Sequence, residues 1–253
     1  MHLRRVLGLL PLALLLLAWH LAVQEKVYPP VLLPPIPKVL AVFVDDLPTV
    51  IDNALSSVGR VIVGIGLSFL VAVPLGLMIG RYRWLDLVTD WSIQIFRSVP
   101  PISLIPLAIL FLGIGDKPAI ALIFLSGLWP LLINTIFGVR TIERTLIKVA
   151  RAARASEFLV MKDIILPASL PAIFTGLRLA VGGGWLTVVT AEMIAVKSGL
   201  GYMILNAQLT FRSDLIIAGI IVIGAIGLLA DQAVRRVRAH VCRWQEGLTA
   251  ANE

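Results

Sequence analysis

Charged and metal-binding residues are scarce in this sequence. Asp, Glu, Lys and Arg make up 15% of the 253 residues, and there are three histidines and one cysteine, Cys242. One cysteine cannot form an internal disulfide or a multi-thiolate metal site, and no histidine has the spacing of a zinc ligand set. The composition therefore excludes a disulfide-stabilised fold and argues against a metal centre.

Sequence signatures of catalysis are missing as well. No phosphate-binding G-x-x-x-x-G-K-[ST] loop occurs, because the segment from Gly113 to Lys117 has the wrong spacing. No serine, histidine and acid are grouped in a way that indicates a nucleophilic mechanism. We therefore expect no catalytic residue, no metal and no cofactor bound by this chain, and we do not expect an enzyme.

Apolar residues, in contrast, are abundant. They reach 58% of the chain and the mean hydropathy is +0.95, whereas about a quarter of a soluble domain is charged. A soluble fold of this size would leave large apolar patches exposed, so we predict an all-α membrane protein. The formal charge of +7 is explained by basic residues that set membrane orientation, and not by a nucleic-acid partner.

Six apolar segments are candidates for transmembrane helices, each of which needs about 20 mostly apolar residues. The third candidate is short and begins with two prolines. The first is long for a signal peptide and no A-x-A cleavage site follows it, which favours a retained span over a cleaved signal. The six segments are residues 6–23, 58–80, 99–113, 118–139, 173–196 and 215–234.

Basic residues fall mainly on one side of this arrangement. Sixteen of the 22 lysines and arginines lie at the N-terminus, between the second and third spans, around the connection of the fourth and fifth, and after the sixth. Because loops that stay in the cytoplasm carry the excess of Lys and Arg, both termini are predicted to be cytoplasmic. An even number of spans agrees with this orientation.

The chain divides into four parts on this basis. They are an N-terminal transmembrane helix (1–23), a periplasmic proline-rich and amphipathic segment (24–57), a five-helix core (58–234) and a basic cytoplasmic tail (235–253). Five prolines between residues 29 and 37 forbid a continuous helix there. Residues 45–57 mix acidic and apolar side chains, which predicts an amphipathic helix, and we favour its packing against the bundle.

The core contains an unusually long cytoplasmic loop at residues 140–171, rich in alanine and charge. Neither proline nor glycine interrupts residues 143–163, so this segment is predicted to be helical. Pro167 and Pro171 are expected to end the helix before the next span begins. An amphipathic helix in the cytoplasm needs a partner for its apolar face.

This loop resembles the cytoplasmic motif of permeases from binding-protein-dependent ATP-binding-cassette (ABC) importers, which reads Glu-Ala-Ala, three residues, Gly, nine residues, Ile-x-Leu-Pro. Ala150 and the end formed by Ile164, Leu166 and Pro167 match the motif. Lys148 stands at the position of its Glu and Arg154 at the position of its Gly. An arginine can still adopt a helical conformation there, although it should stiffen or reshape the bend.

Further segments, in order from Ser57 to Trp244, are similar to the nitrate, sulfonate and taurine subfamily of these permeases. Each match is weak alone, and their order and spacing together are specific. The matching segments are residues 57–64, 74–76, 97–101, 105–107, 113–115, 171–180, 191–194 and 198–202, with Trp185, Gly227 and Asp231.

The resemblance implies a MetI-like fold of about six transmembrane helices in a bacterial inner membrane, surrounded by lipid. It further implies a homodimer that works with two ATPase subunits, which bind ATP and Mg, and with a periplasmic or lipid-anchored solute-binding protein. The solute would be a small anion such as nitrate, an alkanesulfonate, taurine or bicarbonate. The coupling helix that docks on the ATPase would comprise Val149, Ala150, Arg151, Ala153, Arg154, Ala155, Ser156, Ile164, Leu166 and Pro167.

A permease must also present small or polar groups along a translocation path. Our candidates for the path or its gate are Ser68, Gln94, Gly183, Thr187, Thr190 and Glu192. Glycines in a span also serve helix packing, and Glu192 is expected either to pair with another span or to lie at a gate. Arg60, Arg97 and Arg178 are the cations nearest span ends, where they attract an anion or anchor the interface.

Two other classes of protein remain compatible with the sequence. One is a membrane scaffold or enzyme subunit whose basic loop binds a cytoplasmic partner or anionic lipid. The other is a secondary carrier that works without ATP, although such carriers usually show paired repeats, and none is evident here. The loop motif has a specific role only in the importer.

Overall fold

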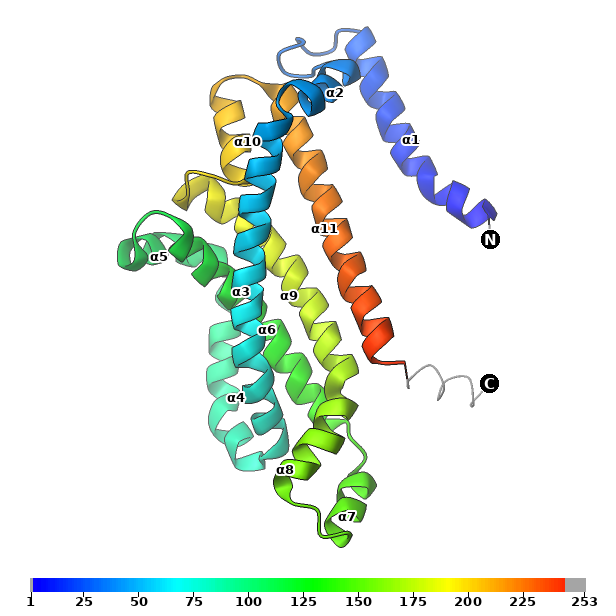
Figure 1. The fold of residues 1–253 in the computed structure, drawn as a ribbon. Helices are drawn as coiled ribbons and strands as arrows, with labels where there is room; N and C mark the ends of the chain where they lie inside the picture. Colours follow the sequence, from blue (N-terminus) through cyan, green and yellow to red (C-terminus); the bar gives the residue numbers. More distant parts are fainter. Residues whose placement is uncertain (1, 244–253) are drawn as a thin grey trace.

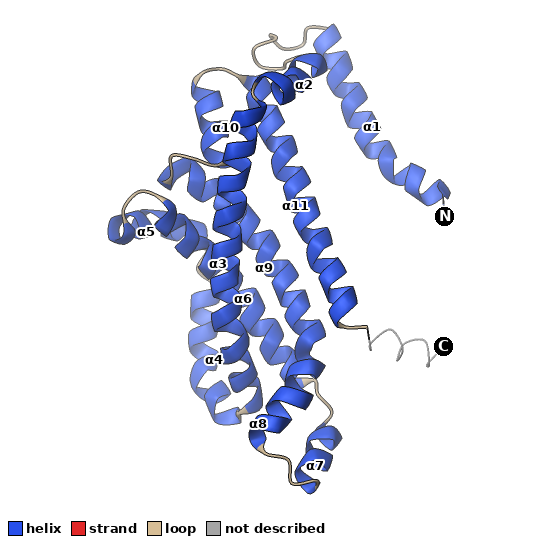
Figure 2. Cartoon of the chain, viewed as in Figure 1, coloured by secondary structure: helices blue, strands red, loops and turns tan. Residues whose placement is uncertain are grey.

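The computed structural model describes residues 2–243, and every regular element in this range is helical (Figures 1 and 2). Residues 244–253 of the predicted basic tail lie outside the described range. The elements are α1 (His2–Gln24), α2 (Ile36–Asp45), α3 (Leu47–Arg81), α4 (Arg83–Arg97), η1 (Pro101–Leu104), α5 (Ile105–Leu112), α6 (Asp116–Arg140), α7 (Arg144–Ala152), α8 (Glu157–Val160), η2 (Met161–Ile165), α9 (Leu166–Ala195), α10 (Leu200–Leu209) and α11 (Ser213–Val241).

Four helices in the described range are long and apolar enough to cross a membrane: α3, α6, the continuous helix over residues 157–195, and α11. A fifth span is formed if α4 and the following helical residues up to Leu112 are counted together, although they are bent by 79°. α1 has 23 residues, which at 1.5 Å per residue is about 35 Å. The all-α membrane architecture is confirmed, with four to five helices of spanning character among the described residues against the six predicted.

The core of the bundle is formed by α3, α6 and α9, which pack along one another (Figure 1). Two glycines of α3 allow its close approach to α6. A Cβ at Gly64 would lie 2.6 Å from the Cγ2 atom of Ile123, and one at Gly76 would lie 2.6 Å from the Cβ atom of Thr135. Small residues that let helix backbones approach are the usual means of packing in membranes, where helix association has no hydrophobic drive from water.

α3 is longer than the predicted second span. It covers 35 residues, so a single helix runs across the boundary placed between residues 57 and 58. The amphipathic residues 47–57 form its first turns, and Val50 packs into the core. A helix is favoured throughout because neither proline nor glycine occurs between Thr49 and Ser57.

The third predicted span, residues 99–113, also differs in the structure. It consists of η1 and the eight-residue α5, which are too short to cross a membrane without α4. The break lies at Pro100 and Pro101, because proline disfavours helix at the preceding residue. α10 was not predicted at all, and it lies between α9 and α11.

α11 runs from the end of the bundle that carries α2 and α10 toward the end that carries α7, and α1 runs in the opposite direction, from the N-terminus to the end that carries α2 (Figure 1). The indole N–H of Trp19 in α1 donates a hydrogen bond to the Pro34 carbonyl at 3.1 Å. Arg212, just before α11, pairs with Asp46 at 2.6 Å and with Asp214 at 3.1 Å. Hydrogen bonds to these carboxylates raise the pKa of Arg212 above its usual range, so Arg212 stays protonated and both ion pairs are kept.

Candidate functional site

The connection between α6 and α9 contains two short helices with a tight bend between them (Figure 1). α7 ends at Ala152 and α8 begins at Glu157. Arg154, between them, has a left-handed backbone with φ of 57°, a conformation that costs free energy for any residue with a Cβ. The prediction of unbroken helix over residues 143–163 is therefore wrong, and the break lies where the family motif has glycine.

Replacing Arg154 with glycine should raise the unfolding free energy by about 1 kcal/mol, because glycine adopts this conformation without a Cβ clash. The neighbouring Ala153 has φ of −75°, so Ala153→Gly is a matched control and should lower stability. Thermal unfolding in detergent measures both. Equal destabilisation by the two glycines would contradict the assigned strain at Arg154.

The helix after the bend is not ended by Pro167 or Pro171. Residues 161–165 form a π-helical segment in which the Leu166 N–H donates to the Met161 carbonyl, and α9 follows directly. Pro167 lies in the first turn of α9, where a residue without an N–H is tolerated. Residues 157–195 therefore form one 39-residue helix, and the predicted termination is wrong.

α7 is fixed to the bundle through one face. Ile147 and Ala150 pack onto a small buried cluster of Val139, Val160 and Ile165. This cluster joins the end of α6, the end of α8 and η2, so α7 is attached to both helices that flank the connection. Ala150, the residue that matches the family motif, thus has a packing role.

Neighbouring positions of α7 and α8 carry exposed apolar side chains. Val149 is 63% and Phe158 is 75% exposed, and Leu146 and Leu159 also lie at the surface. We call these four residues the α7–α8 apolar surface. Contiguous exposed apolar groups of this kind are typical of a surface that binds a partner protein.

Glu157 holds the bend against α3 through two ion pairs. Its carboxylate accepts from Arg81 at 2.8 Å and from Arg151 at 2.9 Å. Sequence reasoning included Arg151 but missed Glu157. The sequence pattern that could have identified it is a serine followed by an acid, which is typical of a helix start. In the structure Ser156 is the N-cap of α8, and its hydroxyl accepts from the Leu159 N–H at 3.3 Å.

The ten predicted coupling residues therefore lie together at one end of the bundle, from α7 to the first turn of α9. Ala153 and Arg154 are exposed in the bend, Ala155 and Ile164 are half-buried, and Leu166 and Pro167 begin α9. Their arrangement is a bent hairpin fixed at both sides to long helices.

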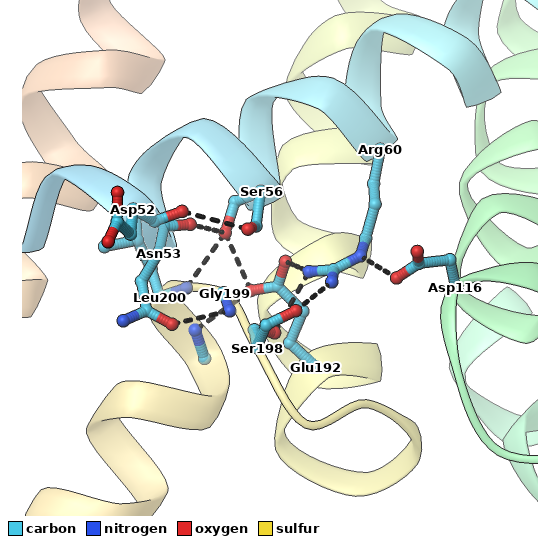
Figure 3. Close-up of polar contacts among 11 residues, drawn as sticks. Asp52, Asn53, Ser56, Arg60, Asp116, Glu192, Ser198, Gly199 and Leu200 are labelled. Atoms are coloured by element: carbon cyan, nitrogen blue, oxygen red, sulfur yellow. Dashed lines mark hydrogen bonds and ion pairs between the residues drawn. The ribbon is translucent and has the colours of Figure 1, made fainter. Parts of the chain in front are cut away.

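A buried polar cluster lies at the other end of α9 (Figure 3). Glu192 is fully buried and accepts hydrogen bonds from the guanidinium Nη1 of Arg60 at 2.6 Å, from Ser57 at 2.8 Å and from the Gly201 N–H at 3.0 Å. Arg60 also donates through Nε to Asp116 at 2.8 Å. These contacts join α3, α6, α9 and α10, and we call them the Arg60–Glu192 cluster.

The same cluster fixes the loop between α9 and α10 to α3. The Gly199 N–H donates to Asn53 at 2.7 Å and the Leu200 N–H to Ser57 at 2.9 Å (Figure 3). Gly199 has φ of 104°, and a Cβ there would collide with the Glu192 carboxylate. Only glycine therefore fits without displacement.

The other predicted path residues are not gathered into one cavity. Ser68 donates to carbonyls of α3 and α6 at 2.9 Å and 2.8 Å, and Thr187 donates to the Gly183 carbonyl at 2.9 Å. Thr190 bonds within its own helix in the same way at 3.3 Å. Gln94 lies apart from these residues on α4, where it contacts Asp90.

Of the three candidate cations, two are used in ion pairs. Arg60 belongs to the cluster above, and Arg178 of α9 pairs with Asp231 of α11. Arg97 lines a cavity of about 430 Å³ between α4 and α6 together with Gln94. Among the described residues, no group of three or more His, Cys, Asp or Glu is arranged to hold a metal ion.

Comparison with known proteins defines the class to which this geometry belongs. The family model for the binding-protein-dependent transport system inner membrane component matches residues 72–241. The taurine transport system permease protein of Escherichia coli is 32% identical over 242 residues, 92% of this chain and 87% of its own length. The bicarbonate transport system permease protein of Synechococcus elongatus is 36% identical over 193 residues, 76% of this chain and 69% of its own.

The fold is also found in a solved structure. A chain of the MetNI methionine ABC transporter, in an inward-facing conformation, superposes with a TM-score of 0.64 at 18% identity, covering 77% of this chain and 97% of that one. The fold of the bundle is therefore that of this ABC transporter chain, and the relatives named above are membrane-embedded transport subunits. The chain belongs to the family of binding-protein-dependent transport system inner membrane components.

Proposed function

We propose that this chain is the permease subunit of an ATP-driven importer for a small anion. Two copies would form the translocation path at their interface, two separate ATPase subunits would bind ATP and Mg, and an external binding protein would deliver the solute. Closure of the ATPase pair would move the two permease copies between inward-open and outward-open arrangements.

The observation that carries this proposal is the continuous helix over residues 157–195. One end of it begins at the α7–α8 apolar surface, and the other end carries Glu192 in the Arg60–Glu192 cluster. At 1.5 Å per residue the helix is about 58 Å long. We call α7, the bend at Arg154 and α8 the coupling hairpin. A partner that displaces the coupling hairpin would therefore move a single continuous helix that reaches the Arg60–Glu192 cluster.

The coupling hairpin is suited to an ATPase partner. Leu146, Val149 and Phe158 present an apolar contact, and Arg154 projects from the bend beside them. Interfaces that bind tightly combine such an apolar centre with a polar rim. The ten predicted coupling residues are assigned to this contact, partly by packing as in Ala150 and partly by exposure as in Val149.

The proposed substrate class rests on the named relatives and on the cavity beside α4. The two relatives above are permeases for taurine and for bicarbonate by their names. In this chain Arg97, Gln94 and Arg140 line one cavity together with Asp86 and Asp90. Asp86 pairs with Arg140 and Asp90 accepts from Gln94, which leaves the Arg97 guanidinium as the donor for an oxyanion. Nitrate, an alkanesulfonate, taurine and bicarbonate are the solutes to test.

We further propose that the α7 end of the bundle faces the cytoplasm of a bacterial inner membrane. Most of the basic residues lie at this end of the chain's helices, as cytoplasmic loops require. The N-terminal end of α1 and the C-terminal end of α11 both point away from the end that carries α2 (Figure 1), so both termini would be cytoplasmic. The Arg60–Glu192 cluster would then close the external end, with Glu192 as part of the gate.

Native mass spectrometry of the tagged chain, purified in mild detergent from its own host, tests the assembly. We expect two copies of the chain with two copies of an ATPase that has a phosphate-binding loop. Uptake of the four candidate anions into proteoliposomes, with and without ATP, then tests the activity. A stable assembly without any ATPase, even after an ATPase is added, would favour a scaffold, and uptake without ATP would indicate a secondary carrier.

A further inference from the structure

A second cavity, of about 670 Å³, lies where α3 and α6 end beside α7. Its lining is strongly basic. Asp86 is the acidic residue in the lining, and it is paired with Arg140. The cationic residues of the lining are Arg81, Arg83, Arg140, Lys148 and Arg151.

The charge of this cavity is only partly neutralised within the described residues. Asp86 and Glu157 together pair with three of the five cations, Arg140, Arg81 and Arg151. Arg83 and Lys148 form no ion pair in this part of the chain. Five cations facing two carboxylates leave a net charge of about +3, which attracts an anion.

One of the lining residues also has an unused donor. The Nε atom of Arg81 is buried and has no hydrogen-bond partner among the described residues, although its Nη2 atom binds Glu157 at 2.8 Å. A buried donor without a partner costs free energy. Guanidinium groups bind phosphate through several parallel N–H donors, so a phosphate group is the natural complement of this lining.

The position of the cavity indicates where such a phosphate comes from. Arg81 and Arg140 are the last residues of two spanning helices, so the cavity lies at the depth of lipid headgroups. α4 begins beside it and has no buried residue. Trp84 is 64% and Trp91 is 74% exposed on this helix, and tryptophan is enriched at the membrane interface.

We propose that this cavity is a binding site for the headgroup phosphate of an anionic phospholipid, whose acyl chains lie along the apolar face of α4. Basic pockets between membrane helices are known to suit such headgroups. Because Lys148 and Arg151 belong to α7, a bound lipid would connect the coupling hairpin to the membrane surface. The cavity adjoins the Arg97 cavity assigned to the transported anion and shares Asp86 and Arg140 with it, but Arg97 is not part of its lining.

The test is a titration of the delipidated full-length chain with phosphatidylglycerol or phosphatidylcholine, followed by native mass spectrometry. Phosphatidylglycerol is expected to bind more tightly. The double substitution Arg83→Gln and Lys148→Gln removes the two cations without an ion pair and should weaken that binding about thirtyfold, at about fivefold per cation. Arg236→Gln with Arg238→Gln, an equal loss of charge at the end of α11, is the matched control and should leave the affinity within about twofold.

Several results would overturn the proposal. They are equal affinity for the two lipids, equal weakening by the two double substitutions, or an unchanged affinity after Arg83→Gln and Lys148→Gln. A bound species with the mass of inorganic phosphate or of a nucleotide, in place of lipid, would overturn the lipid source. If the double variant does not fold, Lys148→Gln alone should still weaken binding about fivefold.

Discussion

Substitution of Arg60 by methionine is expected to lower the unfolding free energy by about 3–5 kcal/mol. Glu192 would stay fully buried and would keep only the Ser57 hydroxyl and the Gly201 N–H as donors. An uncompensated charge in a buried site is costly, because its attraction to the lost partner no longer offsets desolvation. Thermal unfolding in detergent, followed by tryptophan fluorescence, measures the loss.

Two further variants show whether the loss in Arg60→Met comes from leaving a charge buried or from losing an ion pair as such. Arg178→Met breaks the pair with Asp231, in which Arg178 is 50% exposed, and should cost about 1 kcal/mol or less. The double variant Arg60→Met with Glu192→Leu replaces the buried pair with apolar groups and should recover much of the loss. Equal effects of Arg60→Met and Arg178→Met would show that the Arg60–Glu192 cluster does not hold the bundle.

Substitution of Ala150 by arginine should abolish solute uptake while the chain still inserts into the membrane. Ala150 packs on the cluster of Val139, Val160 and Ile165 that attaches α7 to the bundle. A long charged side chain cannot be accommodated there, so α7 must detach from α6 and η2. Uptake into proteoliposomes that contain the ATPase and the binding protein measures the effect.

Ala150→Ser is the matched control for this prediction, because the added hydroxyl is small and can bond within the helix. We expect uptake close to that of the parent chain. Val149→Arg changes the exposed face of α7 instead and should impair the contact with the ATPase without loosening α7. Normal uptake by Ala150→Arg at equal expression would refute the coupling role of this segment.

The spanning helices could largely be predicted from the sequence, because long apolar runs have few alternatives in a membrane. α6 was predicted within two residues of both ends, and α11 within two residues of its start, although it continues seven residues beyond the predicted end. α3 was placed too short, since its first turns carry Asp52 and Asn53 and resemble an interfacial helix. Their polar side chains are compatible with a helix that extends beyond the hydrocarbon layer and meets the α9–α10 loop.

In the coupling hairpin, tertiary contacts override the helix propensities and helix-ending signals that can be read from the local sequence. Arginine has good helix propensity, yet Arg154 has a left-handed backbone, because α7 and α8 are both fixed to the buried cluster at Val139 and cannot be collinear. Pro167 usually indicates a helix end, yet the π-helical turn before it accommodates the missing N–H. Both outcomes depend on contacts that no sequence window contains.

Residue spacing groups the α3 members of the Arg60–Glu192 cluster on one helix face but does not identify the partner of Glu192. Asn53, Ser57 and Arg60 are separated by four and three residues, so they lie on one face of α3. Sequence reasoning predicted that Glu192 either pairs with another span or lies at a gate, and the structure pairs it with Arg60. The sequence itself contains no signal for which of the three candidate arginines faces this carboxylate.

The glycine contacts of α3 have a consequence for how such permeases diversify. At Gly64 and Gly76 even a single methyl group would overlap α6, so these positions tolerate almost no substitution. α4, in contrast, has no buried residue, so its residues can change without disturbing the contact between α3 and α6. Permeases that evolve new solute preferences should therefore differ mainly in α4 and keep these two glycines of α3.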